Sequence, residues 1–479
     1  MVFFLWYGRI YIWILAFAGM TKSPFINLVG DMMCLTIPGK IESIDDKGIA
    51  TVLSHRERAQ IDLSLVFDVH PGDWILYATN RAVKAISEDD AREIISLLED
   101  NYSPVDVSRL PLEFKKIIYK VRSGNHDLTK KEIAYLLDLK GKNNLETLYA
   151  EANTLRTDKI KDFVCIHGII EFSNYCKNLC LYCGIRNGNK IERYRLGSEE
   201  IVRVAKAAVD EEGYKLLVLQ SGEDDFYSDQ ELIEVVKEIK KEMRVFVFLS
   251  VGERSLEFYK KAYQAGASGA LIRFETSNPD LYTEMRPGHK LENRIDLIKG
   301  MIGMGYYMAT GNLIGLPEQT LGDIADDLLL IKKLGAPMIS AGPWLAARGV
   351  PLAEVESQKS KVEKSLATSY QLPASKQEQL ELTLKYIAVA RFMMPEVKIP
   401  VTTALETLDP ENGRHRGLLA GANALMFNLT PEKYAGDYSI YDNKYREREK
   451  VWQKYGLFKG EESYEMLEER LMLPIKSSC

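Results

Sequence analysis

The stretch FVCIHGIIEFSNYCKNLCLYC, residues 163 to 183, decides the fold of this chain of 479 residues. Residues 163–172 form a mostly apolar run, which is typical of a β-strand buried on both faces. Three cysteines follow at once, Cys176, Cys180 and Cys183, spaced C-x3-C-x2-C with Tyr182 before the last. They are half of the six cysteines in the chain. Such clustering after a buried strand indicates metal or thiol chemistry rather than a disulfide scaffold.

Seven more apolar, β-rich runs follow, at residues 215–222, 245–252, 269–276, 306–315, 337–344, 399–406 and 423–430. Most are separated by segments with period-3.6 apolar spacing, such as 198–213, 229–243 and 321–335, which predict helices. A regular alternation of this kind predicts an α/β fold, a parallel (β/α)8 TIM-type barrel. Its active site should lie at the carboxyl ends of the strands.

The sequence before the barrel has a different character. From residue 33 to 86, short β-branched runs alternate with Gly, Asp and Pro, which predicts a small OB-like β-barrel. Ser87 should then cap an amphipathic helix. We expect a leader at 1–32, a β-barrel domain at 33–98, a linker at 99–111, and a barrel with N-terminal helices and a C-terminal helical tail at 112–479.

Residues 1–32 allow two interpretations. The apolar run from Ile10 to Gly19 is too short to span a bilayer comfortably, and only Arg9 precedes it as a positive charge. The segment 1–32 is either a signal peptide or membrane anchor, or it results from a wrongly assigned start codon. In the second case translation begins at Met32 or Met33. Export would carry the thiols into an oxidising space, so we expect a cytoplasmic protein with no membrane partner.

The composition is that of an ordinary globular protein with a large core, 46% hydrophobic and 27% charged. Lys and Arg number 62 against 68 Asp and Glu, a net charge of −6 that is spread along the chain. A nucleic-acid surface concentrates positive charge, so nucleic acid is not expected as a partner.

Three chemistries are open for the cysteine triplet. A zinc site needs a fourth ligand, and the nearest candidates, Cys165 and His167, lie back along the predicted strand. A redox dithiol of Cys180 and Cys183 leaves Cys176 unexplained. A 4Fe-4S cluster held by three thiolates would use all of them and keep one iron open for a ligand.

The cysteine spacing, with an aromatic residue before the third cysteine and after the first strand of a β/α barrel, resembles the radical S-adenosylmethionine (SAM) superfamily. The resemblance implies that Cys176, Cys180 and Cys183 bind a 4Fe-4S cluster, beside Tyr182, and that SAM chelates the open iron. It also implies reductive cleavage of SAM to a 5′-deoxyadenosyl radical.

Residues at other predicted strand ends match groups that this cofactor needs. Ser221, Gly222 and Glu223 stand in the place of the superfamily's Gly-Gly-Glu segment, which meets the amino group of SAM. Arg294 is a candidate to pair with the carboxylate of SAM. Gly315, in NLIGLPEQT, is expected to let the backbone approach the adenine.

Arg273 and Glu275 stand two apart after the fourth predicted strand, so we expect them on one face. Glu275 suits the adenosyl moiety, and Arg273 suits an anionic group of the cofactor or substrate and is a candidate catalytic residue.

The segments IIEFSNYCKNLCLYCGIRNGN, LQSGED, RFETSNP, ENR, GLPEQT and IPVTTA resemble the HydE family of FeFe-hydrogenase maturases, in the biotin-synthase-like group, over about residues 112 to 445. The resemblance implies radical chemistry on a cysteine-bound iron carbonyl cyanide precursor of the hydrogenase H cluster. It also implies an electron donor such as ferredoxin or flavodoxin and other hydrogenase maturases as partners. By analogy, the substrate cavity would be lined by Arg273, Thr402, Thr403 and Tyr434. Because Thr402 and Thr403 are adjacent on a predicted strand, we expect only one of them to face the barrel.

The segment GPWLAARGVPL, with Arg348 and Gly349, departs from the Pro- and His-containing segment of the HydE family. A methylornithine-synthase-like or other biotin-synthase-like enzyme acting on a small amino acid therefore stays open as an alternative.

The segments MCLTIPGKI and PGDWIL resemble the HypC family of hydrogenase-formation chaperones over about residues 33–98. That resemblance implies that Cys34, which would be the first residue after removal of Met33, binds iron. This chain has Ala78 at the position where that family has a histidine, which puts iron binding by the domain in question. A non-enzymatic, iron-carrying assembly scaffold is the second alternative for the whole chain.

Overall fold

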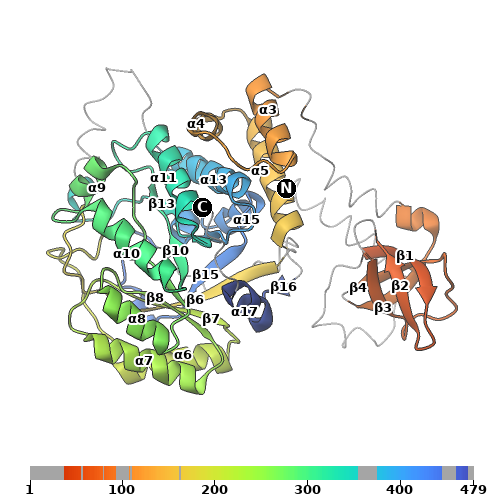
Figure 1. The fold of residues 1–479 in the computed structure, drawn as a ribbon, viewed down its shortest axis with the longest axis horizontal. Coiled ribbons are helices and arrows are strands. Elements are labelled where there is room, and N and C mark those ends of the chain that lie inside the picture. Colours follow the sequence, from red (N-terminus) through yellow and green to blue (C-terminus); the bar gives the residue numbers. More distant parts are fainter. Residues whose placement is uncertain are drawn as a thin grey trace. The chain divides into compact units, whose positions relative to one another are not determined.

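The computed structural model of the chain describes residues 37–54, 58–78, 80–92, 107, 110–160, 163–353, 375–444 and 460–472. The chain forms two compact units, residues 1–103 and 104–479, both drawn in Figure 1. Across the described ranges, no helix is long and apolar enough to cross a lipid bilayer. The interpretations of residues 1–32 and of Cys34 concern residues outside the described part of the chain.

The first unit contains a small closed β-barrel, as the sequence predicts. Its strands follow the order β1-β2-β3-β5-β4, and β1 also pairs with β4. Ile41, Val52 and Ile61 point inward and are at most 1% exposed. After the last strand, Ser87 Oγ accepts the backbone N–H of Asp90 at 3.0 Å, which confirms the predicted helix cap. The strands are β1 (Ile37–Ile44), β2 (Ile49–Leu53), β3 (Arg58–Asp62), β4 (Trp74–Ala78) and β5 (Arg81–Ile86).

Three helices precede the large barrel of the second unit: α3 (Leu112–Arg122), α4 (Lys130–Asp138) and α5 (Lys142–Ile160). A capping box starts α4, since Thr129 Oγ1 accepts the N–H of Glu132 and Glu132 Oε2 accepts the N–H of Thr129. Helix α4 packs against α11 (Leu321–Leu334), and α5 packs against α13 (Lys376–Met393).

Eight parallel strands form the wall of the large barrel, and each overlaps one predicted run. Around the sheet they are β12 (Met338–Ile339), β10 (Tyr307–Thr310), β9 (Gly269–Leu271), β8 (Phe246–Ser250), β7 (Leu216–Ser221), β6 (Phe163–Ser173), β15 (Ala424–Asn428) and β14 (Pro400–Val401). A bridge between Met338 and Lys398 joins the two edges of this sheet. The predicted (β/α)8 TIM-type barrel is therefore confirmed. Two short strands, β11 (Leu313–Ile314) and β13 (Gly342–Pro343), pair separately.

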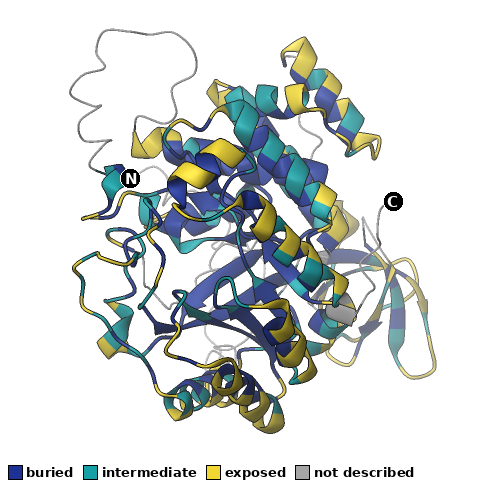
Figure 2. Cartoon of the chain, turned by 60° about the vertical axis from the view of Figure 1, so that its left-hand side comes forward, coloured by how far each residue is buried: buried dark blue, intermediate teal, exposed yellow. Residues whose placement is uncertain are grey.

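Helices cover the outside of the barrel, with their polar faces toward solvent (Figure 2). The predicted helices at 198–213, 229–243 and 321–335 appear as α6, α7 and α11. The full set of described helices after β6 is α6 (Ser198–Asp210), α7 (Asp229–Glu242), α8 (Leu256–Gln264), α9 (Pro279–Met285), α10 (Leu291–Gly303), α11, α13, α14 (Thr403–Leu408), α15 (Gly413–Leu419), α16 (Glu432–Ala435) and α17 (Tyr464–Met472).

The seventh predicted run is a strand only at its start. Strand β14 ends at Val401, Thr402 is the N-cap residue of α14, and Thr403 is its first helical residue. The prediction of a strand through residue 406 is therefore wrong, and alternation along a strand does not apply to the two threonines. The turn into α14 brings both to the cavity described below.

The C-terminal segment packs at the amino-terminal ends of the strands. Strand β16 (Gly460–Glu461) pairs with the start of β6, at Phe163 and Val164. The carboxylate of Glu462 lies 2.5 Å from the Lys398 ammonium, and both side chains are at most 2% exposed. Leu467 of α17 joins the apolar core inside the barrel. This end of the barrel is thus filled by packing and one buried ion pair.

Candidate active site

A cavity lies at the carboxyl ends of the barrel strands, where the fold predicts it. It gathers residues at or after β6, β7, β8, β9, β11, β13, β14 and β15, together with Arg286 and Arg294 from the region of α9 and α10. Nearly all of the residues predicted for the site in the second unit line it: Cys176, Cys180, Tyr182, Cys183, Ser221, Gly222, Glu223, Arg273, Glu275, Arg294, Thr402 and Thr403.

The loop that carries the three cysteines, residues 174–190, is held on two sides, and we call it the cysteine loop. The N–H of Leu181 donates to the Met285 carbonyl at 2.9 Å, and the N–H of Gly184 donates to the Ile440 carbonyl at 2.8 Å. At Gly184 a Cβ would stand 2.1 Å from the Ser439 carbonyl oxygen, so the approach requires glycine. Cys180 and Tyr182 also pack in an apolar group that includes Leu281, Met285, Leu313, Leu316, Trp344 and Leu352. This packing buries Cys180, whereas Cys176 and Cys183 are half-buried.

The cysteine geometry favours a cluster over a single metal ion. Burial raises the pKa of the Cys176, Cys180 and Cys183 thiols, so they stay protonated until a metal displaces the proton. Among the residues with described positions, no three His, Cys, Asp or Glu side chains converge on one point. In a cubane each thiolate binds a different iron, so convergence is not needed. Cys165 and His167, the candidates for a fourth zinc ligand, contact each other at 3.1 Å and do not line the cavity.

Two buried arginines lie beside the cysteine loop and were partly missed by the sequence analysis. Arg294 Nε donates to Glu253 Oε1 at 2.7 Å, and Arg286 Nη1 donates to the Tyr182 hydroxyl at 3.3 Å. Oε1 of Glu223 lies 3.6 Å from Arg286 and 3.8 Å from Arg294. Burial opposes ionisation of Glu253, but Arg294 and Arg286 outweigh it and lower the pKa of that carboxyl. The site is therefore a network of charged side chains that are mostly buried.

The walls of this region fit the cofactors that the superfamily uses. Arg286 Nε, Arg294 Nη2 and Glu275 Oε2 are buried and have no hydrogen-bond partner within the described parts of the chain. SAM offers a carboxylate to guanidinium groups and ribose hydroxyls to a carboxylate. Glu275 has φ +68°, and Arg273 Nε lies 3.4 Å from its Oε2. A left-handed, non-glycine residue in a cavity wall is a form of strain found at functional sites.

The far side of the cavity carries a second polar group, of which the sequence analysis identified only Thr403. Glu171 is hydrogen-bonded to the Lys444 ammonium, and it accepts a hydrogen bond from Asn428 Nδ2 at 2.8 Å. Tyr441 and Thr403 share a hydrogen bond of 2.7 Å between their hydroxyls. All five residues line the cavity. A carboxylate inside the apolar run 163–172 was the available signal for Glu171.

Two predicted residues lie elsewhere. Tyr434 is not among the described residues that line the cavity, and its ring stacks on Tyr194 with centroids 4.8 Å apart, whereas Tyr441 does line the cavity. Gly315, with φ +79°, is also absent from the lining. A Cβ at Gly315 would stand 2.2 Å from Gln379 Oε1, so its glycine is explained by backbone conformation and packing.

Comparison with known proteins decides the family. The model of the Radical SAM superfamily matches residues 170–331, and that of the HupF/HypC family matches residues 33–98. The [FeFe] hydrogenase maturase subunit HydE of Thermotoga maritima is 39% identical over 319 residues, which are 66% of this chain and 85% of that protein. The chain belongs to the HydE family. It is a radical SAM enzyme with an N-terminal HupF/HypC domain, and the cofactors of its superfamily are a 4Fe-4S cluster and SAM.

Other relatives share the scaffold of this HydE-family chain. The 3-methylornithine synthase of Methanosarcina barkeri is 29% identical and covers 71% of this chain and 90% of its own length. The crystal structure of methylornithine synthase (PylB) has a TM-score of 0.62 at 26% identity, covering 74% of this chain and 99% of that one. The structure of the [FeFe]-hydrogenase maturase HydG has a TM-score of 0.57 at 20% identity, covering 73% and 76%, and supports the fold.

Proposed function

We propose that this chain reductively cleaves SAM at a 4Fe-4S cluster held by Cys176, Cys180 and Cys183, and that it acts in assembly of the FeFe-hydrogenase H cluster. The observation that carries the proposal is one cavity in which three buried or half-buried thiols adjoin buried donors and acceptors that lack hydrogen-bond partners among the described residues. When bound, the cluster supplies one electron that breaks the sulfonium carbon–sulfur bond of SAM, giving methionine and a 5′-deoxyadenosyl radical.

The protein's own residues bind and orient SAM. Glu223, which follows β7, would accept hydrogen bonds from the ammonium group, with the backbone of Ser221 and Gly222 beside it. Arg294 would pair with the carboxylate through the Nη2 atom that lacks a hydrogen bond in the described structure. Glu275 would accept hydrogen bonds from the ribose hydroxyls. Each assignment matches a charge or a hydrogen-bonding group already present in the wall.

The substrate would occupy the remaining cavity. Arg273 would pair with a carboxylate, and Thr402, Thr403 and Tyr441 would supply hydroxyl groups around it. A cysteine-bound iron carbonyl cyanide carries both a carboxylate and polar diatomic ligands, so this wall suits such a precursor. An external donor such as ferredoxin or flavodoxin would provide the electron, and other maturases would supply or receive the iron species.

The N-terminal domain would carry iron to the same pathway through Cys34. Covalent linkage of the two modules raises the effective concentration of a shared intermediate. Because Ala78, the last residue of β4, stands where the HypC family has a histidine, the thiolate would hold the iron with fewer protein ligands. We expect Cys34→Ser in the full chain to lower hydrogenase maturation most at low protein concentration. Equal maturation by both proteins at every concentration would contradict the proposed carrier role.

Anaerobic reconstitution of the full chain tests the radical chemistry. We expect dithionite-reduced protein to release 5′-deoxyadenosine and methionine from SAM, and Cys180→Ser to fall to the protein-free background. Cys165→Ser is the matched control, because Cys165 is fully buried and absent from the cavity lining, so iron content and cleavage should stay unchanged. Unchanged cleavage in Cys180→Ser would refute the proposal.

A methylornithine-synthase-like reaction is the second candidate, favoured by the fold match with methylornithine synthase. That enzyme class rearranges the carbon skeleton of an amino acid. Incubation of the reconstituted chain with lysine, followed by mass spectrometry, separates the candidates. Formation of methylornithine would favour the second, and turnover of a cysteine-bound iron species with no change in lysine would favour the first.

A further inference from the structure

Two arginines directly after the cysteine loop fold back onto the site without entering it. The guanidinium of Arg193 donates to the carbonyl oxygen of Asn174, to that of Ile185 at 2.9 Å and to that of Arg186 at 2.8 Å. Arg193 therefore ties residues that precede the cysteines to residues that follow them. The next arginine, Arg195, makes a different connection.

Arg195 binds the residue that follows Glu223. Its Nε and Nη2 atoms donate to the two carboxylate oxygens of Asp224 at 2.7 and 2.9 Å. The Asp224 side chain is 3% exposed and also accepts hydrogen bonds from Ser173 Oγ at 2.7 Å and from the Phe226 N–H at 3.1 Å. Burial opposes ionisation, but the hydrogen bonds from Arg195 and Ser173 lower the pKa of Asp224. The pair is thus ionised, bidentate and buried on its acidic side.

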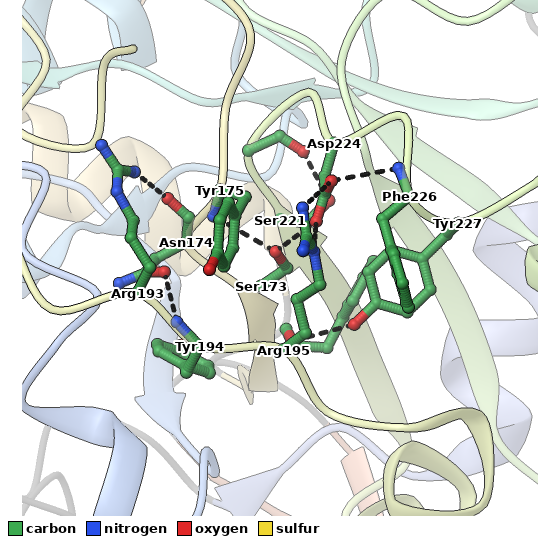
Figure 3. Close-up of polar contacts among 12 residues, drawn as sticks. Ser173, Asn174, Tyr175, Arg193, Tyr194, Arg195, Ser221, Asp224, Phe226 and Tyr227 are labelled. Carbon is green, nitrogen blue, oxygen red and sulfur yellow. Dashed lines mark hydrogen bonds and ion pairs between the residues drawn. The ribbon is translucent and has the colours of Figure 1, made fainter. Parts of the chain in front are cut away.

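The same guanidinium lies between two aromatic rings, one from each loop (Figure 3). Its central carbon is 3.5 Å from the ring centroid of Tyr175, which precedes Cys176, and 4.5 Å from that of Phe226, which follows Asp224. Cation–π contacts of this kind add to the ion pair and restrict the orientation of the guanidinium. Arg195 therefore contacts the cysteine loop and the loop after β7 at once.

The two loops that Arg195 joins also contact each other through their backbones. The N–H of Gly222 donates to the Ser173 carbonyl at 3.1 Å, and the N–H of Lys177 donates to the Glu223 carbonyl at 2.9 Å. Neither Arg195 nor Asp224 lines the cavity. They are therefore placed to position other residues and not to touch a bound cofactor.

We propose that Arg195 and Asp224 form a clamp that fixes the segment Ser221–Glu223 against the cysteine loop and thereby strengthens SAM binding. The inference rests on the proposed function, because it assigns positioning residues for the cofactor of that reaction. A guanidinium–carboxylate pair with two hydrogen bonds sets both distance and orientation, which the single ammonium of lysine does not. The clamp is separate from cluster retention, since the thiol side chains do not contact Arg195 in any described interaction.

The test compares Arg195→Met with Arg244→Met in the full chain. Arg244 is the matched control, because it also pairs with a carboxylate, Glu465 at 3.1 Å, and stacks on a ring, Tyr464 at 4.1 Å, away from the cavity. Hydrogen exchange of the Gly222 and Lys177 amides is measured without SAM. Iron content and SAM-dependent release of 5′-deoxyadenosine are then measured after reconstitution.

We expect Arg195→Met to speed exchange at both amides and to raise the KM for SAM by about 10-fold or more, the usual effect of losing an outer-shell partner. Iron content should match wild type and kcat should stay within about twofold, because the clamp acts on binding. Arg195→Lys should show intermediate values, and Arg244→Met should show none of these changes.

Unchanged exchange, or loss of iron together with the rise in KM, would overturn the clamp. If wild-type protein fails to cleave SAM, the proposed function fails, and the exchange measurement still decides whether Arg195 holds the two loops together. If Arg195→Met does not fold, Arg195→Lys and Asp224→Asn preserve side-chain size and decide the question by the same exchange readout.

Discussion

The tightest contact between the two cofactor-binding loops is at Gly222, and it predicts a large effect of one methyl group. A Cβ there would stand 2.2 Å from the Tyr175 carbonyl oxygen and 2.7 Å from Cys176 Cβ, whereas ordinary contacts begin near 3.4 Å. Neither atom can rotate away, because each moves only with the backbone of the cysteine loop. Gly222→Ala must therefore separate the loops by about 1 Å.

The magnitude follows from that displacement. Overpacking of this kind costs about 1–3 kcal/mol, and a shift of about 1 Å between reacting groups reduces rates by about 100-fold. We expect kcat/KM for SAM cleavage to fall by about 100-fold in Gly222→Ala. The assay is release of 5′-deoxyadenosine against SAM concentration, with iron content measured on the same sample.

A matched substitution isolates the contact. Gly303, in α10, has no atom within 4 Å of its added Cβ and no left-handed backbone, so Gly303→Ala should cleave SAM like wild type. If Gly222→Ala keeps kcat/KM within about threefold of wild type, the loops are not held as closely as the structure indicates, and the reasoning about SAM binding fails.

Two further predictions concern the opposite end of the barrel. Glu462→Ala removes the carboxylate that neutralises buried Lys398 and should lower the free energy of unfolding by about 3–5 kcal/mol. The control is Glu461→Ala, which removes a partly exposed 3.6 Å pair with Lys215 and should cost at most about 1 kcal/mol. Equal losses of unfolding free energy in denaturant titration would contradict this prediction. Burial lowers the pKa of His167 to about 3, so below about pH 6.5 the unfolded chain binds a proton that the folded chain does not. Stability should therefore fall with pH by about 1.4 kcal/mol per unit from this residue. His167→Gln should lose less unfolding free energy than wild type between about pH 6.5 and 5. An identical dependence of stability on pH in the two proteins would contradict the role given to His167.

The barrel and much of its site could be predicted because their signals are local. Parallel strands buried on both faces appear as apolar runs whatever they pair with, so the sequence predicts all eight without their order in the sheet. The cysteine spacing and the Ser221–Glu223 segment each lie within a few residues at a strand end. Topology alone then brings them to one cavity.

The rest depends on contacts that span long stretches of sequence. Tyr434 and Tyr441 are both tyrosines after the last barrel strand, and only the path of the chain after α16 decides which one reaches the cavity. Arg286 and Glu253 are separated by 33 residues and resemble surface charges in the sequence. The pairing of β16 with the start of β6 joins residues almost 300 positions apart, and no local pattern marks it.

Strand β6 links the two ends of the barrel and explains why substitutions at the two ends should have different effects. It runs from Phe163 to Ser173, pairs with β16 at its start and leads into the cysteine loop at its end. In a β/α barrel the amino-terminal ends of the strands contribute stability and the carboxyl ends carry the chemistry. Loss of Glu462 should therefore lower stability without changing the KM for SAM, since the cavity lies at the other end of the strands. A methyl group at Gly222 should impair SAM cleavage by about 100-fold, at a cost in stability of about 1–3 kcal/mol. If Glu462→Ala also raised the KM for SAM, β6 would transmit strain along its length, and the barrel would act as one cooperative unit instead of two separable ends.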